Sequence, residues 1–139
     1  LCDGASDEAA CRTEFEELSS TTGFGWHSHP LDLFYYLAVN EGESNSAIAS
    51  KDDVLSFLGA IESTDEAVLA ALAEGYYWDT DKEAGAIKEV EGGFELIVIK
   101  SVSLCMPIQS NRILLRIDRD GTQSVLREEV LRKLDDHCA

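Results

Sequence analysis

Residues 86–126 read AIKEVEGGFELIVIKSVSLCMPIQSNRILLRIDRDGTQSVL, and this stretch decides the fold. Apolar and polar residues alternate along much of it, and a period of two indicates β-strands that expose one face. Glu91-Gly92-Gly93 interrupts the alternation, and paired glycines at such a point favour a tight turn. The segment therefore predicts a β-hairpin that joins strands at residues 86–90 and 94–103.

A second hairpin is predicted further along the chain. Residues 118–121 read Asp-Arg-Asp-Gly, which is typical of a turn, and they separate strands at residues 112–117 and 122–126. In the first of these strands, the alternation places two sets of side chains on opposite faces. We expect Ile113, Leu115 and Ile117 to face the core and Arg112, Leu114 and Arg116 to face away from it. The four strands together predict an antiparallel meander.

The sequence on either side of the meander has helical spacing. N-terminal to it we expect four helices, which begin after Ser6, Pro30, Ser50 and either Ser63 or Thr64. The second of these covers residues 31–40, and it is apolar nearly all round. The third has Ser50 and Asp53 in the positions of a capping box. After the strands, the spacing of Val130, Leu131 and Leu134 predicts a short C-terminal helix.

The expected fold class is α+β, because helices and strands are segregated along the chain. About four N-terminal helices, within residues 1–75, would pack on a four-stranded antiparallel meander. The meander and the short C-terminal helix would occupy residues 76–139. A chain of 139 residues predicts one domain, residues 1–139, and is long enough to bury its own core.

Four cysteines indicate an oxidising compartment. None of them lies in a CxxC pair, so their spacing does not favour a zinc ribbon or a thioredoxin-type centre. Two disulfides in an exported protein are expected, and a periplasmic, lumenal or extracellular location follows. A first residue other than Met agrees with removal of a signal peptide, and a lipid anchor on Cys2 is a less favoured alternative. The favoured pairing is Cys2–Cys11 with Cys105–Cys138, and its strongest rival is Cys2–Cys138 with Cys11–Cys105.

The net charge is strongly negative and unevenly distributed. The chain has 27 acidic and 11 basic residues, for a net charge of −16. Residues 1–83 contain 18 acidic and 3 basic residues, whereas residues 84–139 contain 9 and 8. Such a surface repels nucleic acid and anionic lipid headgroups, and no apolar run approaches the ~20 residues of a membrane span. The acidic half could serve solubility alone, or it could dock a basic protein partner.

Catalytic and metal-binding motifs are weak in this sequence. His27 and His29 could share a transition metal, although no further ligand is identifiable from spacing. Residues 79–83 resemble the opening of a calcium loop but lack the Gly and Glu that must follow. No GxSxG, SxxK or glycine-rich phosphate loop occurs. We therefore expect no enzyme activity, no cofactor and no resident metal. A small ligand- or metal-binding module that uses His27 and His29 is the alternative.

Two groups of side chains are candidate contact residues. One group is acidic, and the other is aromatic and suited to interfaces if its members are exposed. We expect a non-enzymatic exported protein that acts by contact with a protein partner or by self-association. It would be a subunit or accessory component of a larger envelope or extracellular assembly. An inhibitor or immunity-type protein that neutralises a basic partner is a further alternative. The acidic group is Glu14, Glu16 and Glu17, and the aromatic group is Tyr35, Tyr36, Tyr76, Tyr77 and Trp78.

Overall fold

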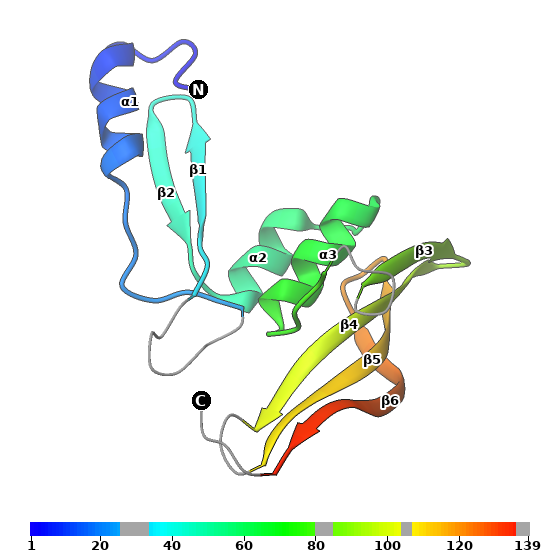
Figure 1. Ribbon diagram of the computed structural model, residues 1–139. Helices are drawn as coiled ribbons and strands as arrows, with labels where there is room; N and C mark the ends of the chain where they lie inside the picture. The colour runs from blue at the N-terminus through cyan, green and yellow to red at the C-terminus, as the bar shows by residue number, and fades with distance from the viewer. Residues whose placement is uncertain (26–33, 80–84, 104–106, 136–139) are drawn as a thin grey trace.

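The computed structural model describes residues 1–25, 34–79, 85–103 and 107–135. In Figure 1, α1 lies beside the β1–β2 hairpin at one end, α2 and α3 lie between, and the larger sheet lies at the other end. The larger sheet is antiparallel with the order β3-β4-β5-β6, and β1 pairs with β2 in a separate antiparallel sheet. The elements are α1 (Glu8–Glu17), β1 (Leu37–Glu41), β2 (Ser44–Ile48), α2 (Lys51–Leu58), α3 (Thr64–Ala73), β3 (Ala86–Val90), β4 (Gly93–Ser103), β5 (Ile108–Asp118) and β6 (Gln123–Leu134).

The expected layer of four N-terminal helices is wrong. In the described residues, only α1 precedes the first strand, and α2 and α3 lie between the two sheets in the chain. Three of the predicted helices do form, because each has a side chain that satisfies free N–H groups at its start. Asp7, rather than Ser6, caps α1, while Ser50 caps α2 and Ser63 caps α3.

The second predicted helix is also wrong. Residues 31–33 of that prediction lie outside the described residues, and Leu37–Glu41 forms strand β1. An apolar run rich in aromatic residues suits a strand as well as a buried helix, so its periodicity did not distinguish the two. Gly42, which follows the predicted helix, has a φ of +63° and lies in the β1–β2 turn. The segment after it, Ser44–Ile48, is β2.

The C-terminal helix is the third error. Its residues belong to β6, which pairs with β5 from Ile117↔Gln123 to Ile108↔Leu134. The Glu, Leu, Arg and Lys residues of this segment favour a helix in isolation. The free N–H and C=O groups along β5 outweigh that preference, because pairing satisfies the backbone of both strands.

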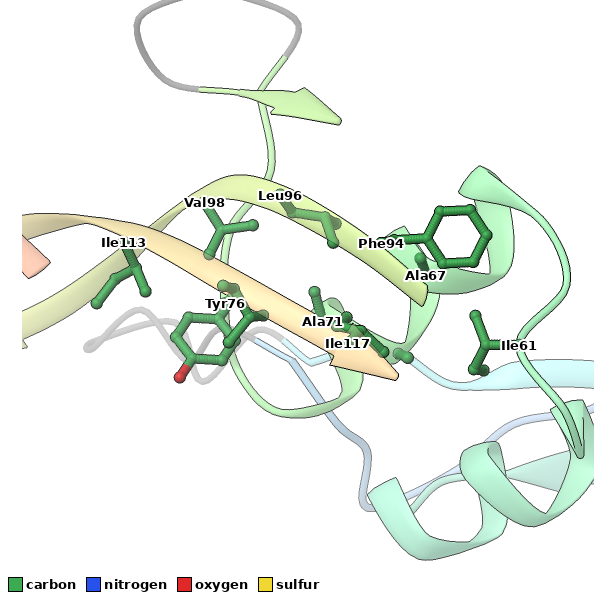
Figure 2. Close-up of a cluster of buried hydrophobic side chains, with 11 residues drawn as sticks. Ile61, Ala67, Ala71, Tyr76, Phe94, Leu96, Val98, Ile113 and Ile117 are labelled. Carbon is green, nitrogen blue, oxygen red and sulfur yellow. The ribbon is translucent and has the colours of Figure 1, made fainter. Parts of the chain in front are cut away.

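The larger sheet packs one face against α3. On that face, β4 and β5 oppose each other in the pairs Phe94↔Ile117, Leu96↔Leu115 and Val98↔Ile113. Figure 2 shows Phe94, Leu96, Val98, Ile113 and Ile117 with Ala67 and Ala71 of α3, and with Ile61 and Tyr76. The predicted inward orientation of Ile113, Leu115 and Ile117 is confirmed, since each is 0–1% exposed.

A smaller apolar cluster connects the N-terminal part of the chain to the helices. It consists of Phe24, Val54 of α2 and Ala73 of α3. Leu58 packs against this cluster and against the main core. The helices α2 and α3 therefore link the two sheets through apolar contacts on both sides.

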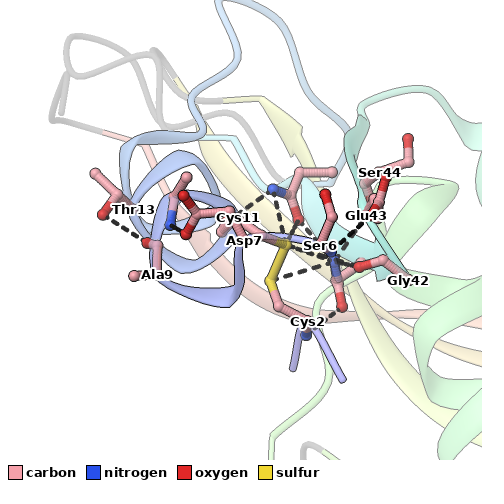
Figure 3. The surroundings of a disulfide bond; sticks show 12 residues. Cys2, Ser6, Asp7, Ala9, Cys11, Thr13, Gly42, Glu43 and Ser44 are labelled. Carbon is pink, nitrogen blue, oxygen red and sulfur yellow. Dashed lines mark hydrogen bonds between the residues drawn. A yellow bond between two sulfur atoms is a disulfide. The ribbon is translucent and has the colours of Figure 1, made fainter. Parts of the chain in front are cut away.

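The predicted Cys2–Cys11 disulfide is confirmed. Both cysteines are buried, and the disulfide lies beside Gly42 of the β1–β2 hairpin (Figure 3). The Cys2 N–H donates to Asn40 Oδ1 at 2.7 Å, and Asn45 Nδ2 donates to the Cys11 carbonyl oxygen at 3.0 Å. Asn40 Nδ2 also donates to Asn45 Oδ1 at 2.9 Å. Cys105 and Cys138 lie outside the described residues, so their pairing stays a prediction.

Candidate protein-interaction surface

The strand β6 forms one edge of the larger sheet. Its twelve residues, Gln123–Leu134, pair only with β5 among the described residues (red in Figure 1). An edge strand presents N–H and C=O groups that can pair with a further strand. We call Gln123–Leu134 the β6 edge.

The β6 edge carries an unusual amount of exposed apolar surface. Proteins commonly protect an edge with charged residues or with short strands. Here the charged residues are present, but pairs or short runs of them are separated by large aliphatic side chains. Val130 is the most exposed of these, at 57%. The exposed aliphatic residues are Val125, Leu126, Val130, Leu131 and Leu134.

Two β-bulges divide the β6 edge. The register passes from Leu115↔Val125 to Leu114↔Arg127, and from Asn111↔Val130 to Ser110↔Arg132. Leu126 and Leu131 therefore have no opposing residue in β5. A bulge reverses the alternation of faces beyond it, because one extra residue enters one strand. Both extra residues are exposed leucines, so each bulge adds apolar surface at the edge.

Charged side chains on the β6 edge are oriented by β5. Glu129 accepts a hydrogen bond from Arg112 Nε at 2.7 Å, and Arg112 Nη2 lies 2.6 Å from the same oxygen. This hydrogen bond, with the positive charge of Arg112, lowers the pKa of Glu129 below its ordinary value. Glu128 accepts a hydrogen bond at 2.6 Å from Nδ2 of Asn111, the buried polar residue of β5.

The predicted acidic contact group lies on α1. Glu14, Glu16 and Glu17 are all exposed, on a helix whose inner side carries Cys11. The structure therefore presents these three carboxylates to solvent, in a part of the chain that the disulfide holds. Their role as an interface stays a prediction.

The predicted aromatic group divides between core and surface. Tyr76 is buried in the main core, and Trp78 packs against that core. The Tyr36 hydroxyl donates to the Leu18 carbonyl oxygen at 3.0 Å, which ties the residue before β1 to the C-cap of α1. Tyr35 and Tyr77 are exposed, at 54% and 42%, and they could serve as contact anchors. Their backbones pair with Phe24 and Ile99 respectively, so the two tyrosines extend from different β-bridges.

Neither His27 nor His29 lies in the described residues, so the metal-binding alternative cannot be located on the fold. Across the part of the chain that the structure describes, no group of three or more His, Cys, Asp or Glu side chains has the arrangement of a metal site. Residues 80–83 of the calcium-like segment also lie outside the described residues. Asp118 ends β5, and Asp120 lies in the β5–β6 turn, where its Oδ1 accepts from the Thr122 N–H at 2.9 Å.

An open cleft of about 660 Å³ lies between the start of α2, the end of α3 and the end of β4. Residues 23–25, 49–51, 73–75 and 101–103 line it. An ion pair between Lys51 and Glu74 marks its wall, and the hydrogen bond to Glu74 raises the pKa of Lys51. The size falls within the range of small-molecule sites, about 300–1,000 Å³.

Sequence reasoning missed the β6 edge, because residues 127–134 were interpreted as a helix. In a helix, Val130, Leu131 and Leu134 share a face that packs inward. In the strand, all three are exposed. The turn at residues 118–121 was the signal in the sequence that could have predicted the edge. The strand that begins after this turn pairs with β5 well beyond residue 126.

No helix among the described residues is long and apolar enough to cross a membrane. Comparison of the chain with protein-family models, with curated proteins and with solved structures found no match.

Proposed function

We propose that this protein acts without catalysis, through protein–protein contact, as an exported subunit or accessory component of a larger assembly. The observation that supports the proposal is the β6 edge. It combines an edge that no further described strand pairs with and exposed aliphatic side chains, over a twelve-residue strand. Surfaces of this kind mark interaction sites in soluble proteins.

Export is supported by the Cys2–Cys11 disulfide. Structural disulfides persist in oxidising compartments and are rare in the cytosol. Here the bond is buried and shielded by the asparagines of the β1–β2 hairpin. A protein with such a bond is suited to a periplasmic, lumenal or extracellular assembly.

The proposal is tested by capture of partners from the native source, with Val130→Lys as the probe. A lysine at this position places a charge in the middle of the β6 edge, which discourages strand pairing. The proposal expects the bound proteins, including added copies of the chain itself, to be lost with this variant. Phe57→Lys is the matched control, because Phe57 is 50% exposed on α2, outside the edge. Equal capture by the wild-type chain and by Val130→Lys would overturn the proposal.

The cleft supports a second candidate, a small-ligand binding role. Its volume and its Lys51–Glu74 pair suit a polar ligand that carries both charge signs. Native mass spectrometry of the protein from its source would show a bound small molecule. Lys51→Met with Glu74→Gln would abolish its retention if the cleft is the site. An unliganded spectrum from freshly isolated protein would remove this candidate.

A further inference from the structure

The middle of the β6 edge has a charge pattern that is antisymmetric along the chain. Residues 128–133 read Glu-Glu-Val-Leu-Arg-Lys: two acidic, two aliphatic and two basic residues. Read in the opposite direction, the same segment begins with the basic pair and ends with the acidic pair. We call residues 128–133 the charge motif.

Antiparallel pairing of two copies would place unlike charges opposite each other along the whole charge motif. If Val130 of one copy opposes Leu131 of the other, Glu129 opposes Arg132 and Glu128 opposes Lys133. The two-fold axis repeats each of these pairs, so one register forms four opposite-charge pairs around an aliphatic centre. Directly opposed unlike charges stabilise strand pairing, and like charges destabilise it.

This register needs the bulge at Leu131. In a regular strand, Glu128 and Lys133 would point to opposite faces, because they are an odd number of residues apart. In β6, however, Glu128 opposes Ile113 and Lys133 opposes Gln109, two residues of β5 that share a face. Glu129 and Arg132 likewise share the other face, because they oppose Arg112 and Ser110. The extra residue therefore brings each acidic residue of the motif to the same face as its basic partner.

The location of the charge motif in the chain also favours a second copy. Contact between two chains of net charge −16 is opposed by their mutual repulsion. The β6 edge lies in residues 84–139, which carry 9 acidic and 8 basic residues, whereas residues 1–83 carry most of the excess. Copies that meet through β6 thus bring together their nearly neutral parts.

We infer that two copies of this chain pair through β6, antiparallel, with Val130 opposite Leu131, and form a continuous eight-stranded sheet. This inference rests on the proposed function and names its partner as a second copy. The backbone groups of the edge would pair across the two-fold axis, as in strand addition. Val130 and Leu131, 57% and 39% exposed in one chain, would be covered by their counterparts.

Complementary charge variants test the register directly. Glu128→Lys with Glu129→Lys makes the motif basic at both ends, and Arg132→Glu with Lys133→Glu makes it acidic at both ends. Each double variant places like charges opposite each other, so each should sediment as a monomer. An equimolar mixture should form a heterodimer, because every opposed pair is then of unlike charge. The wild-type chain should sediment at twice the 15.2 kDa mass of one chain.

The matched control for the basic variant is Glu62→Lys with Glu91→Lys. It makes the same two replacements of Glu by Lys, at exposed positions outside the β6 edge. This control should stay dimeric. Far-UV circular dichroism verifies folding, because Glu128→Lys removes a hydrogen bond from Asn111. The acidic variant leaves that bond in place, so the experiment does not depend on one variant.

Three results would overturn the inference. They are a monomeric wild-type chain at its highest soluble concentration, a dimer that both double variants retain, and two monomeric variants whose mixture stays monomeric. A bulge can also protect an edge strand from pairing. A monomeric wild-type chain would show that the bulge at Leu131 has this protective role. If the monomer still captures another protein through Val130, the proposed function survives while self-pairing fails. If Val130→Lys changes neither the capture of another protein nor the mass of the wild-type assembly, the proposed function and the self-pairing both fail.

Discussion

At the scale of residues, Leu115 and Arg116 are neighbours with opposite surroundings. Leu115 is fully buried between Leu96 of β4 and Val125 of β6. We expect Leu115→Ala to lower the free energy of unfolding by about 2–5 kcal/mol, since the cavity lies in the main core. Arg116 is partly exposed and pairs with Asp118 at 2.7 Å. Arg116→Ala should cost less than about 1 kcal/mol. Urea unfolding measures both, and equal losses would contradict the assigned faces.

Tyr76 gives the core a dependence on alkaline pH. Burial raises the pKa of its phenol above the ordinary value of 10.0, and the carboxylates of Glu74 and Glu128 raise it further, while Lys51 opposes them. Because the folded-state pKa is the higher one, the stabilisation is complete below pH 10.0 and is lost as the pH rises through the folded-state pKa. Tyr76→Phe keeps the ring but cannot ionise. We expect its free energy of unfolding to fall less above pH 10.0 than that of the wild-type chain. Chemical denaturation below and above that pH measures the free energy of unfolding of both chains. If it changes with pH equally in the two, Tyr76 ionises as readily in the folded state as in the unfolded state.

At the scale of elements, α3 owes its start to a reciprocal pair of hydrogen bonds. Ser63 Oγ accepts from the Glu66 N–H at 3.3 Å, and Glu66 Oε2 accepts from the Ser63 N–H at 2.9 Å. The bonds from the backbone N–H groups of Glu62 and Ser63 lower the pKa of Glu66. Ser63→Ala should reduce the free energy of unfolding by about 0.5–2 kcal/mol. Thr64→Ala, at the next exposed position, should stay within about 0.5 kcal/mol. Thermal unfolding that ranks the two variants the other way would contradict Ser63 as the cap.

The strand β6 is an element whose local preference opposes its structure. The residues from Arg127 to Leu134 favour a helix, and the ladder with β5 holds them extended. A peptide of residues 123–135 should therefore show no strand signal in water and should become helical in trifluoroethanol. A peptide of residues 108–118, from β5, should gain less helix. Circular dichroism of the two peptides checks this difference, and a strand spectrum from the isolated β6 peptide would contradict it.

At the scale of the whole molecule, the Cys2–Cys11 disulfide stabilises a peripheral part. The bond closes a short loop, with a sequence separation of 9, for which chain entropy predicts about 2.7 kcal/mol. Neither cysteine belongs to the two apolar clusters that join the sheets. Cys2→Ser with Cys11→Ser should speed hydrogen exchange in α1 and leave β4 and β5 protected. Equal loss of protection in the sheet would show that the bond supports the whole fold.

Elements that depend on local patterns could be predicted from the sequence, and elements that depend on a distant partner could not. Alternation along residues 86–117 predicted β3, β4 and the inward side of β5, because each residue's face follows from its own position in a strand. The caps at Ser50 and Ser63 were also predictable, since a cap acts within three or four residues. The β1–β2 hairpin was not predicted, because an apolar segment such as residues 34–39 fits a helix and a strand equally until a partner is present.

The sequence by itself determined the α+β composition, the antiparallel meander, the core residues of β5 and the division of charge along the chain, and it favoured the Cys2–Cys11 pair. These features depend on local spacing, on composition or on cysteines close in the chain. Only the tertiary structure decided that residues 127–134 are a strand, that its leucines are exposed and that Leu131 is a bulge. Those outcomes depend on β5, because its pairing satisfies the N–H and C=O groups of β6. That pairing outweighs the preference of the β6 residues for a helix, which depends only on neighbours within one turn.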